Sequence, residues 1–582
     1  MCKKERNIVV MKKEVLVIFK THLDIGFTDY ANNILQKYLK EYIPNAIRVG
    51  YELKDTDTPF VWTVGSWLIW QALRHDTEGV VERAVRDGIL RWHALPFTTH
   101  TELMGETLFE YGLSLSQKLD ERFGTKTTGA KMSDVPGHTL GVVPMMKKHG
   151  IRFLHLGVNP ATPLPKVPPI FKWRCGEDEI VVMYQGDYGE EIDLVECILS
   201  FAHTGDNLGP QDAKQVIEVY RQLREKYPDH NIRVGTIDDL ACEVLKIQNL
   251  PVVEDEIGDT WIHGIGTDPE KVSRFKKVMR ALDLWQGELP DLSDSLLCVP
   301  EHTWGLDIKN HFPYADFFSH QDILRMRSEA ERVENSWDEQ RDYVRRAEEL
   351  LSVTPDYPIK KPDTDAYLPV KIPENLPFEV TWQLFDNADY ERYKRDYMRL
   401  LVKWSVWDFT KVGLPDYEGG IFHTRICGAY QKGEEMLYHL AFDEVAKVTY
   451  GLPDFYLSVC GESVTLKWFD KKPSRLPQAF WFKFKGQTER WELHKMGLWL
   501  SPSKIIGSPF ISAIDTGVRN DKYTIESLDC ALVAPYGRKL LQYGERPETE
   551  DLYFNLYNNI WNTNFPMWYS DDALFRFVIK KR

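Results

Sequence analysis

The stretch VLVIFKTHLD, from Val15 to Asp24, joins a run of five apolar residues to two polar side chains at its end. An apolar run with β-branched valine and isoleucine predicts a strand that is covered on both faces, as in a parallel sheet. Helical patterns follow over residues 34–53, 67–86 and 106–123, and short apolar runs separate them. Strands that alternate with helices of this length indicate parallel βαβ units.

About seven such units follow one another, so we expect an N-terminal (β/α)7-type barrel over residues 1–270, with an open doubly wound sheet as the alternative. Charged amphipathic segments then predict a mainly helical middle domain over residues 271–411. Short apolar and aromatic runs broken by Gly, Pro, Asn and Asp predict a β-sandwich over residues 412–582. The expected fold class is therefore α/β plus all-β in one multidomain chain, and its site should lie at the carboxyl ends of the parallel strands.

Composition excludes several classes of function. The 582 residues include 72 Lys and Arg against 87 Asp and Glu, a net charge of −15, which argues against nucleic-acid binding. No apolar run approaches the roughly 20 residues that span a bilayer, so we expect no membrane insertion. The first twenty residues lack the apolar core of a secretory signal, and the eight cysteines form no CxxC pair. We therefore expect a cytoplasmic protein, and a homo-oligomer is compatible with the sequence.

His22 and Asp24 are the first candidates for chemistry. Residues i and i+2 of a strand point to the same side, so both side chains can reach one metal ion. Imidazole and carboxylate are ligands that suit Zn²⁺ and similar ions. Taken alone, an HxD pair also fits a polar strand end with a capping aspartate.

Two later segments add candidates of the same kind. Asp134 lies at a predicted strand end just before a Pro-Gly turn, in SDVPGH, and His302 lies in EHTWG near the end of the barrel region. Two histidines and two aspartates from separate strand ends would form one metal site with room for substrate hydroxyls, provided that the fold brings them together.

The order of these motifs resembles that of the glycoside hydrolase family 38 alpha-mannosidases, in a bacterial branch. THLDIGFTD is similar to the family's HxD strand end, and LMGETLFEYGLSLSQKLDERFG to the segment before its nucleophile strand. SDVPGH resembles the Asp-x-Phe-Gly turn of the nucleophile, HTGDNLGP the segment of the acid/base, and EHTWGLD the region of the last histidine ligand. The likeness covers the first 310 residues and is weaker beyond them.

The resemblance implies a role for each matching residue. His22, Asp24, Asp134 and His302 would bind Zn²⁺ or another divalent metal. Asp134 would also be the nucleophile, and Asp206 the general acid/base, with Asp187 in QGDYGE as the second candidate for that role.

Three departures from the family pattern bear on these roles. Phe27 stands where the family usually has Trp, Pro136 replaces the Phe of the nucleophile turn, and Asn207 follows Asp206 where a second carboxylate is expected.

The predicted function is that of a metal-dependent retaining α-glycosidase, most similar to an α-mannosidase, with a carbohydrate as its substrate. By position, Trp261 and Trp304 are the candidates for stacking on sugar rings, and Asn207 and Asp187 are further candidates for substrate contacts. A metal-dependent amidohydrolase or carbohydrate deacetylase is the alternative enzyme, because HxD also suits an ion that activates water. A relative that binds carbohydrate without turnover is the alternative from another class.

Overall fold

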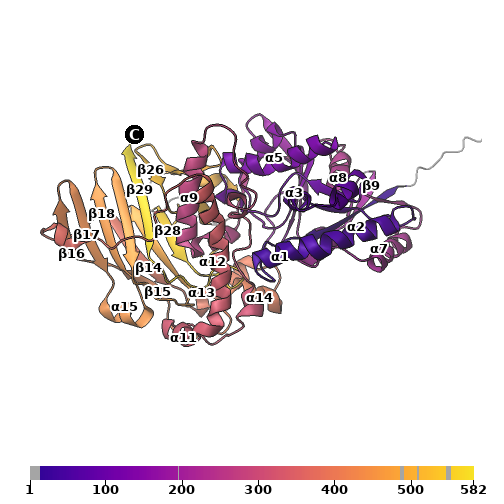
Figure 1. Ribbon diagram of the computed structural model, residues 1–582. Helices are drawn as coiled ribbons and strands as arrows, with labels where there is room; N and C mark the ends of the chain where they lie inside the picture. The colour runs from indigo at the N-terminus through magenta and orange to yellow at the C-terminus, as the bar shows by residue number, and fades with distance from the viewer. Residues whose placement is uncertain (1–12, 195, 485–489, 508–509, 545–551) are drawn as a thin grey trace, which may run out of the picture.

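The computed structural model describes residues 13–582 except residues 195, 485–489, 508–509 and 545–551. An α/β region formed by the first half of the chain lies at one end of the molecule, and the β-sheets of the C-terminal part lie at the other (Figure 1). The long helices α9 (Pro269–Asp283) and α12 (Arg327–Leu350) stand between them. The first twelve residues, which include Cys2 and most of the segment inspected for a signal, lie outside the described residues. In the part of the chain that the structure describes, no helix is both long and apolar enough to cross a membrane.

The first N-terminal sheet is centred on β1 (Glu14–His22), the strand that the apolar run predicts. Along its length β1 pairs in parallel with β9 (Cys197–Asp206). It also pairs in parallel with β10 (Asn231–Val234) and, through Phe19, with β2 (Trp62–Gly65). The sheet continues from β2 to β3 (Leu90–His93) and from β9 to the short β8 (Ile192–Asp193).

The second N-terminal sheet carries β4 (Gly129–Asp134), β5 (Phe153–Val158) and β7 (Asp178–Gln185) in parallel. Antiparallel β6 (Ile170–Cys175) and then β11 (Val252–Val253) complete it. The sheets meet where the Ala94 N–H donates to the Gly129 carbonyl at 3.0 Å.

Strands β9, β1, β2, β3, β4, β5 and β7 thus follow the order expected of a barrel. Among the described residues, however, their ladders form two sheets rather than one continuous ring.

The helices of this region match the expected segments with one clear difference. The helix expected over residues 67–86 is two helices, α3 (Ser66–Arg74) and α4 (Val80–Arg86). Gly79, with φ of 66°, separates them, because this backbone conformation favours glycine and interrupts a right-handed helix. Helix α5 (Glu106–Phe123) has the expected bounds. The region also contains the helical segments α1 (Ala31–Lys37), the π-helical η1 (Tyr38–Tyr42), α2 (Ile43–Leu53), the 3-10 helix η2 (Thr101–Leu103), α6 (Val142–Lys148), α7 (Ala213–Lys226) and α8 (Ile237–Val244).

A loop from the helical middle region returns to the end of β1. This segment, residues 299–307, lies between the short helices η4 (Leu296–Cys298) and α10 (Ile308–His311). The Phe27 N–H donates to the Gly305 carbonyl at 3.1 Å, and the Asp307 N–H donates to the Phe27 carbonyl at 2.8 Å. Backbone pairing therefore fixes His302 against the residues that follow β1. Helix α11 (His320–Arg325) leads into α12.

The C-terminal region is a pair of antiparallel sheets around an apolar core that includes Trp382, Trp468 and Phe480. One sheet has the order β15 (Gly420–His423), β14 (Phe378–Leu384), β20 (Gln478–Phe484), β28 (Tyr553–Asn558), β27 (Leu532–Ala534) and β24 (Ser512–Ala513). The other has the order β13 (Leu368–Pro369), β16 (Arg425–Lys432), β17 (Glu435–Ala441), β18 (Asp454–Cys460), β19 (Ser463–Phe469), β29 (Ala573–Lys581), β26 (Tyr523–Ser527), β25 (Gly517–Arg519), β21 (Glu492–Lys495) and β22 (Leu498–Leu500).

The expected domain boundary at residue 411/412 falls inside this sandwich rather than at its start. Strand β14 pairs with both β15 and β20 along its length, so it belongs to the sheet although it precedes residue 412. Helices α13 (Asn387–Tyr397) and α14 (Lys403–Phe409) are inserted between β14 and β15. These two helices fall in the part of the chain expected to be mainly helical, residues 271–411, but they lie within the sandwich sequence.

The sandwich is tied to the N-terminal region by a buried ion-pair cluster. Lys495 on β21 donates to Glu102 and to Glu256, and all three side chains are almost wholly inaccessible to solvent. Glu256 belongs to β12 (Glu256–Ile257), which pairs in parallel with β23 (Ile505–Ile506). Buried carboxylates are costly without a counter-charge, so Lys495 stabilises both sides of this contact.

Candidate metal and catalytic site

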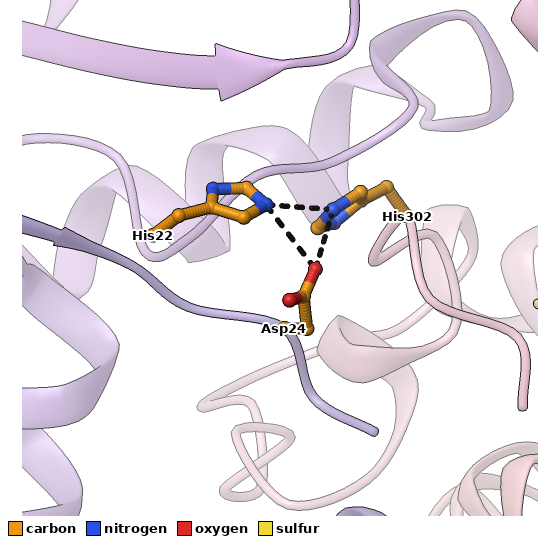
Figure 2. Close-up of side chains that lie close together, drawn as sticks. All are labelled: His22, Asp24 and His302. Atoms are coloured by element: carbon orange, nitrogen blue, oxygen red, sulfur yellow. Dashed lines mark hydrogen bonds and ion pairs between the residues drawn. The ribbon is translucent and has the colours of Figure 1, made fainter. Parts of the chain in front are cut away.

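Three predicted metal ligands converge in the buried interior at the end of β1 (Figure 2). The Nε2 atoms of His22 and His302 lie 3.2 Å apart. Asp24 Oδ1 lies 3.2 Å from the first of these nitrogens and 3.0 Å from the second. His22 is the last residue of β1, and the loop after η4 brings His302 to it from 280 residues further along the chain. The HxD motif predicts two of these three ligands, His22 and Asp24, and the fold adds the third, His302.

The far nitrogens of both rings have partners of their own. His22 Nδ1 hydrogen bonds to Ser133 Oγ at 2.8 Å, and His302 Nδ1 to Glu301 Oε1 at 2.6 Å. Such contacts fix the orientation and tautomer of metal-binding histidines. Here they leave the two Nε2 atoms directed at Asp24.

The arrangement fits a cation. Asp24 Oδ2 is buried and has no hydrogen-bond partner among the described residues. Burial works to lower the pKa of His302, but the charge of Glu301 and the contacts with Asp24 raise that pKa well above its usual value. The negative charge of the nearby carboxylates therefore favours a positive charge at His302. Two nitrogens and a carboxylate oxygen are the donors that zinc-like ions prefer.

Asp134 is the last residue of β4, and it is placed beside the three ligands. Its Oδ2 lies 3.6 Å from His302 Nε2. Its Oδ1 accepts from Asn159 Nδ2 at 2.9 Å and from the Tyr188 hydroxyl at 2.7 Å. Its φ of 78° is unusual for a residue other than glycine, and strained backbone of this kind gathers at functional sites.

Asp206 ends β9 and faces the same hydroxyl. Tyr188 Oη lies 3.2 Å from Asp206 Oδ1. The Oδ1 atoms of Asp134 and Asp206 are therefore no further apart than the combined length of two hydrogen bonds. Burial raises the pKa of Asp206 to about 6, and the nearby charge of Asp24 acts in the same direction. Asp206 therefore holds its proton to a higher pH than an ordinary aspartate.

Tyr188 is held in this position by contacts on its loop. Buried Lys131 donates to the Tyr188 carbonyl, and Arg399, which follows α13, donates to the Gly186 carbonyl. Gln185 Nε2 donates to the Glu190 carbonyl at 2.9 Å. The Tyr188 ring also lies against His22, with ring centroids 4.8 Å apart. The hydroxyl between the two carboxylates is thus fixed by the surrounding fold.

A cavity of about 480 Å³ opens over these groups. Its polar lining includes the side chains around the carboxylates, His22, Asp24, Asp134, Asn159, Asp206 and His302, and further polar residues, Thr28, Asp187, Tyr188, Asp307, Lys309, Asn310, Asp408, Thr563 and Asn564. Its apolar lining comprises Phe27, Pro160, Leu208, Trp261, Trp404 and Phe409. Carboxylates close to apolar and aromatic surface suit a ligand with hydroxyl groups and apolar faces, as sugars have.

Lys309 adds a cation at the edge of this cavity. Its Nζ lies 2.9 Å from Asp307 Oδ1, 2.8 Å from Asp408 Oδ1 and 5.0 Å from the centroid of the Phe27 ring. Burial raises the pKa of Asp408 to about 7, although Lys309 works against this shift. The cluster of Lys309, Asp307 and Asp408 offers one hydrogen-bond donor and two acceptors to a ligand.

The predicted substrate contacts divide into two pairs. Trp261 and Asp187 line the cavity. The Trp304 ring is buried, with the Lys271 ammonium 3.7 Å from its centroid, and its Nε1 donates to the Glu301 carbonyl at 3.1 Å. Asn207 is buried behind the site, where its Oδ1 accepts from the Asp24 N–H at 3.1 Å. The structure therefore does not bring Trp304 or Asn207 to the cavity; both support the segments that carry the ligands.

Sequence reasoning missed several residues that line the cavity. Tyr188 adjoins Asp187 in QGDYGE, the predicted second candidate for the acid/base, but the sequence did not indicate that the Tyr188 hydroxyl contacts both Asp134 and Asp206. Trp404 and Asp408 lie on α14, a helix without any polar motif that would connect it to the N-terminal α/β region. Only the path of the chain places them beside Asp134.

Two solved structures are similar over nearly the whole chain. An alpha-mannosidase from Enterococcus faecalis V583 has a TM-score of 0.59 at 10% sequence identity, covering 98% of this chain and 87% of that one. A protein in glycosyl hydrolase family 38 from Enterococcus faecalis has a TM-score of 0.55, also at 10% identity, covering 98% and 86%. At this identity the likeness is one of fold. It agrees with the expected combination of an α/β region and an antiparallel β-sandwich in one chain.

Sequence comparisons are less informative. Residues 265–361 match the profile of a family described as a domain of unknown function, DUF5054. These residues include His302 together with helices α9 and α12. No curated protein matches the chain at a significant level.

Proposed function

We propose that the chain is a metal-dependent retaining α-glycosidase of the α-mannosidase type, acting on α-linked glycans or oligosaccharides. The observation that carries the proposal is the pair Asp134 and Asp206, which one tyrosine hydroxyl bridges beside a buried His-Asp-His cluster. The likeness in fold to an alpha-mannosidase supports the choice of sugar.

Asp134 is the nucleophile in this proposal. Hydrogen bonds from Asn159 Nδ2 and the Tyr188 hydroxyl hold Oδ1 of Asp134 in place. The carboxylate attacks the anomeric carbon, the bond to the leaving oxygen breaks, and a glycosyl-enzyme forms.

Asp206 is the acid in the first step and the base in the second. Its raised pKa keeps a proton available for the leaving oxygen. In the second step it takes a proton from the water that releases the sugar. The Tyr188 hydroxyl contacts both carboxylates, and this short separation of Asp134 from Asp206 supports a retaining rather than an inverting mechanism.

His22, Asp24, Asp134 and His302 would hold the metal. A bound zinc-like ion supplies Lewis acidity that orients neighbouring sugar hydroxyls. Ser133 and Glu301 fix the two imidazoles for this task through their Nδ1 atoms.

Metal content and product analysis together test the proposal. We expect about one zinc-like ion per chain of purified protein, lost in Asp24→Ala, and hydrolysis of aryl α-D-mannosides that depends on the metal. NMR of the first-formed sugar should show retention of the anomeric configuration. Release of acetate from acetylated sugars, without glycoside cleavage, would favour the deacetylase alternative. Sugar binding without any turnover would favour the non-catalytic alternative.

A further inference from the structure

We propose that the mouth of the cavity beside Asp206 is a subsite for an apolar leaving group, an alkyl aglycone, and that Leu208 determines this specificity. The inference rests on the proposed function and names the class of its leaving group.

Leu208 is exposed although it lines the cavity. The side chain is 66% exposed. It lies two residues after Asp206, and a Cβ atom added to Gly205 would lie 3.5 Å from Leu208 Cδ1. The leucine thus covers the same turn that presents the acid.

The turn is fixed, so this exposure is built into the fold. Asn207 has φ of 51°, and its Nδ2 donates to the Gly26 carbonyl and to Thr28 Oγ1, both at 3.1 Å. The Tyr42 hydroxyl donates to the Asn207 carbonyl at 2.8 Å. Asn207 is directed into the protein and Leu208 out of it.

Other apolar side chains line the same cavity as Leu208. Pro160, Trp261, Trp404 and Phe409 line the same space. The rings of Trp261 and Phe409 have centroids 6.0 Å apart. Single exposed leucines are common on proteins, but several apolar side chains around one cavity indicate a surface that an apolar ligand covers.

In the proposed mechanism, Leu208 lies on the side of the leaving group. A general acid must approach the oxygen that departs, so side chains beside Asp206 meet the aglycone. A sugar packed against Leu208 would place hydroxyls on a side chain that offers them no partner, and only polar residues elsewhere in the lining could bind them. An alkyl chain would instead remove the leucine from water.

Hydrolysis of alkyl α-D-mannosides of increasing length tests the subsite. Methyl, butyl and hexyl glycosides have leaving groups of similar acidity, so differences in kcat/KM report contacts with the chain. We expect kcat/KM to rise about 10-fold or more from methyl to hexyl. In Leu208→Asn this ratio should fall to about 2 or less. Leu368→Asn is the control, because Leu368 is 74% exposed on β13 and does not line the cavity, so the wild-type ratio should persist.

Calorimetric titration with the same glycosides separates this inference from the proposed function. If no glycoside is hydrolysed, the proposed function fails; tighter binding of hexyl than of methyl mannoside, lost in Leu208→Asn, would still support the subsite. Equal or absent binding of the two would overturn it. In an active enzyme, a ratio near 1 in the wild type, or a ratio that survives in Leu208→Asn, would overturn it as well.

Discussion

The polar and apolar linings of the cavity are built in opposite ways. His22, Asp134 and Asp206 are the last residues of three strands, β1, β4 and β9. Each makes a hydrogen bond that fixes its side chain. Trp404 and Phe409 come from α14, and Trp261 from the 3-10 helix η3 (Thr260–Thr267). Trp261 Nε1 is buried and finds no hydrogen-bond partner within the described part of the chain.

The polar lining suits the chemical step, and the apolar lining suits ligand binding. Groups that react must be held to within a fraction of an ångström, and hydrogen bonds on strand ends achieve this. Groups that only cover a ligand need shape and apolar area, which packed helices supply. Substitutions in the polar lining should therefore lower kcat, and substitutions in the apolar lining should raise KM.

The largest effect is expected for Asp134→Asn. The amide cannot act as a nucleophile, so kcat with an aryl α-mannoside should fall by about 10⁴-fold. Metal content of the variant, measured in parallel, shows how much of the loss comes from a missing ligand. A variant that keeps its metal and more than a tenth of the activity would contradict the assignment.

Asp206→Asn should lower kcat by about 10²–10⁴-fold for substrates with poor leaving groups. Because burial raises the pKa of Asp206 to about 6, the acid is protonated below that pH. The wild-type kcat/KM should therefore fall as the pH rises through about 6, and this decrease in the pH profile should be absent in Asp206→Asn. Asp187→Asn is the control, since Asp187 is exposed and its Oδ1 accepts from the neighbouring Tyr188 N–H. If this decrease were instead absent in Asp187→Asn, Asp187 and not Asp206 would be the general acid.

Ser133→Ala tests whether hydrogen bonds behind the ligands matter. Loss of the contact to His22 Nδ1 should weaken metal binding by about 10–100-fold, as for other such partners. Competition with a chelator measures this affinity. Ser116→Ala is a matched control, because Ser116 is buried in α5 and donates to the Leu113 carbonyl rather than to a metal ligand. Equal metal affinity in both variants would mean that Ser133 does not orient the imidazole.

The smallest effect is expected for Trp404→Ala. Loss of one aromatic face should raise KM by about 10-fold and leave kcat within about 2-fold of wild type. Trp407→Ala on the same helix is the comparison, since Trp407 does not line the cavity. A fall in kcat without a change in KM would place Trp404 in the chemistry and remove the distinction between the two linings.

The sequence predicts the polar lining better than the apolar one. His22 and Asp24 are readable because a strand places i and i+2 on one side, and Asp134 because it precedes a Pro-Gly turn. Trp304 and Trp404 look alike in a sequence, yet one is buried beside Lys271 and the other faces the cavity. Burial depends on contacts between distant segments, which local patterns do not encode. The start of the sandwich was misplaced for the same reason, because β14 finds its partners beyond two inserted helices.

The buried cluster of Lys495, Glu102 and Glu256 has a consequence for how the molecule can be divided. A fragment that ends before β21 would lack both the Lys495 ammonium that pairs with the two glutamates and strand β23, which pairs with β12. Loss of one partner from a buried ion pair costs about 3–5 kcal/mol. That is a large share of the stability of an ordinary domain. The α/β region that carries the carboxylates is therefore not an independent module, and heating should melt it together with the sandwich in one calorimetric transition.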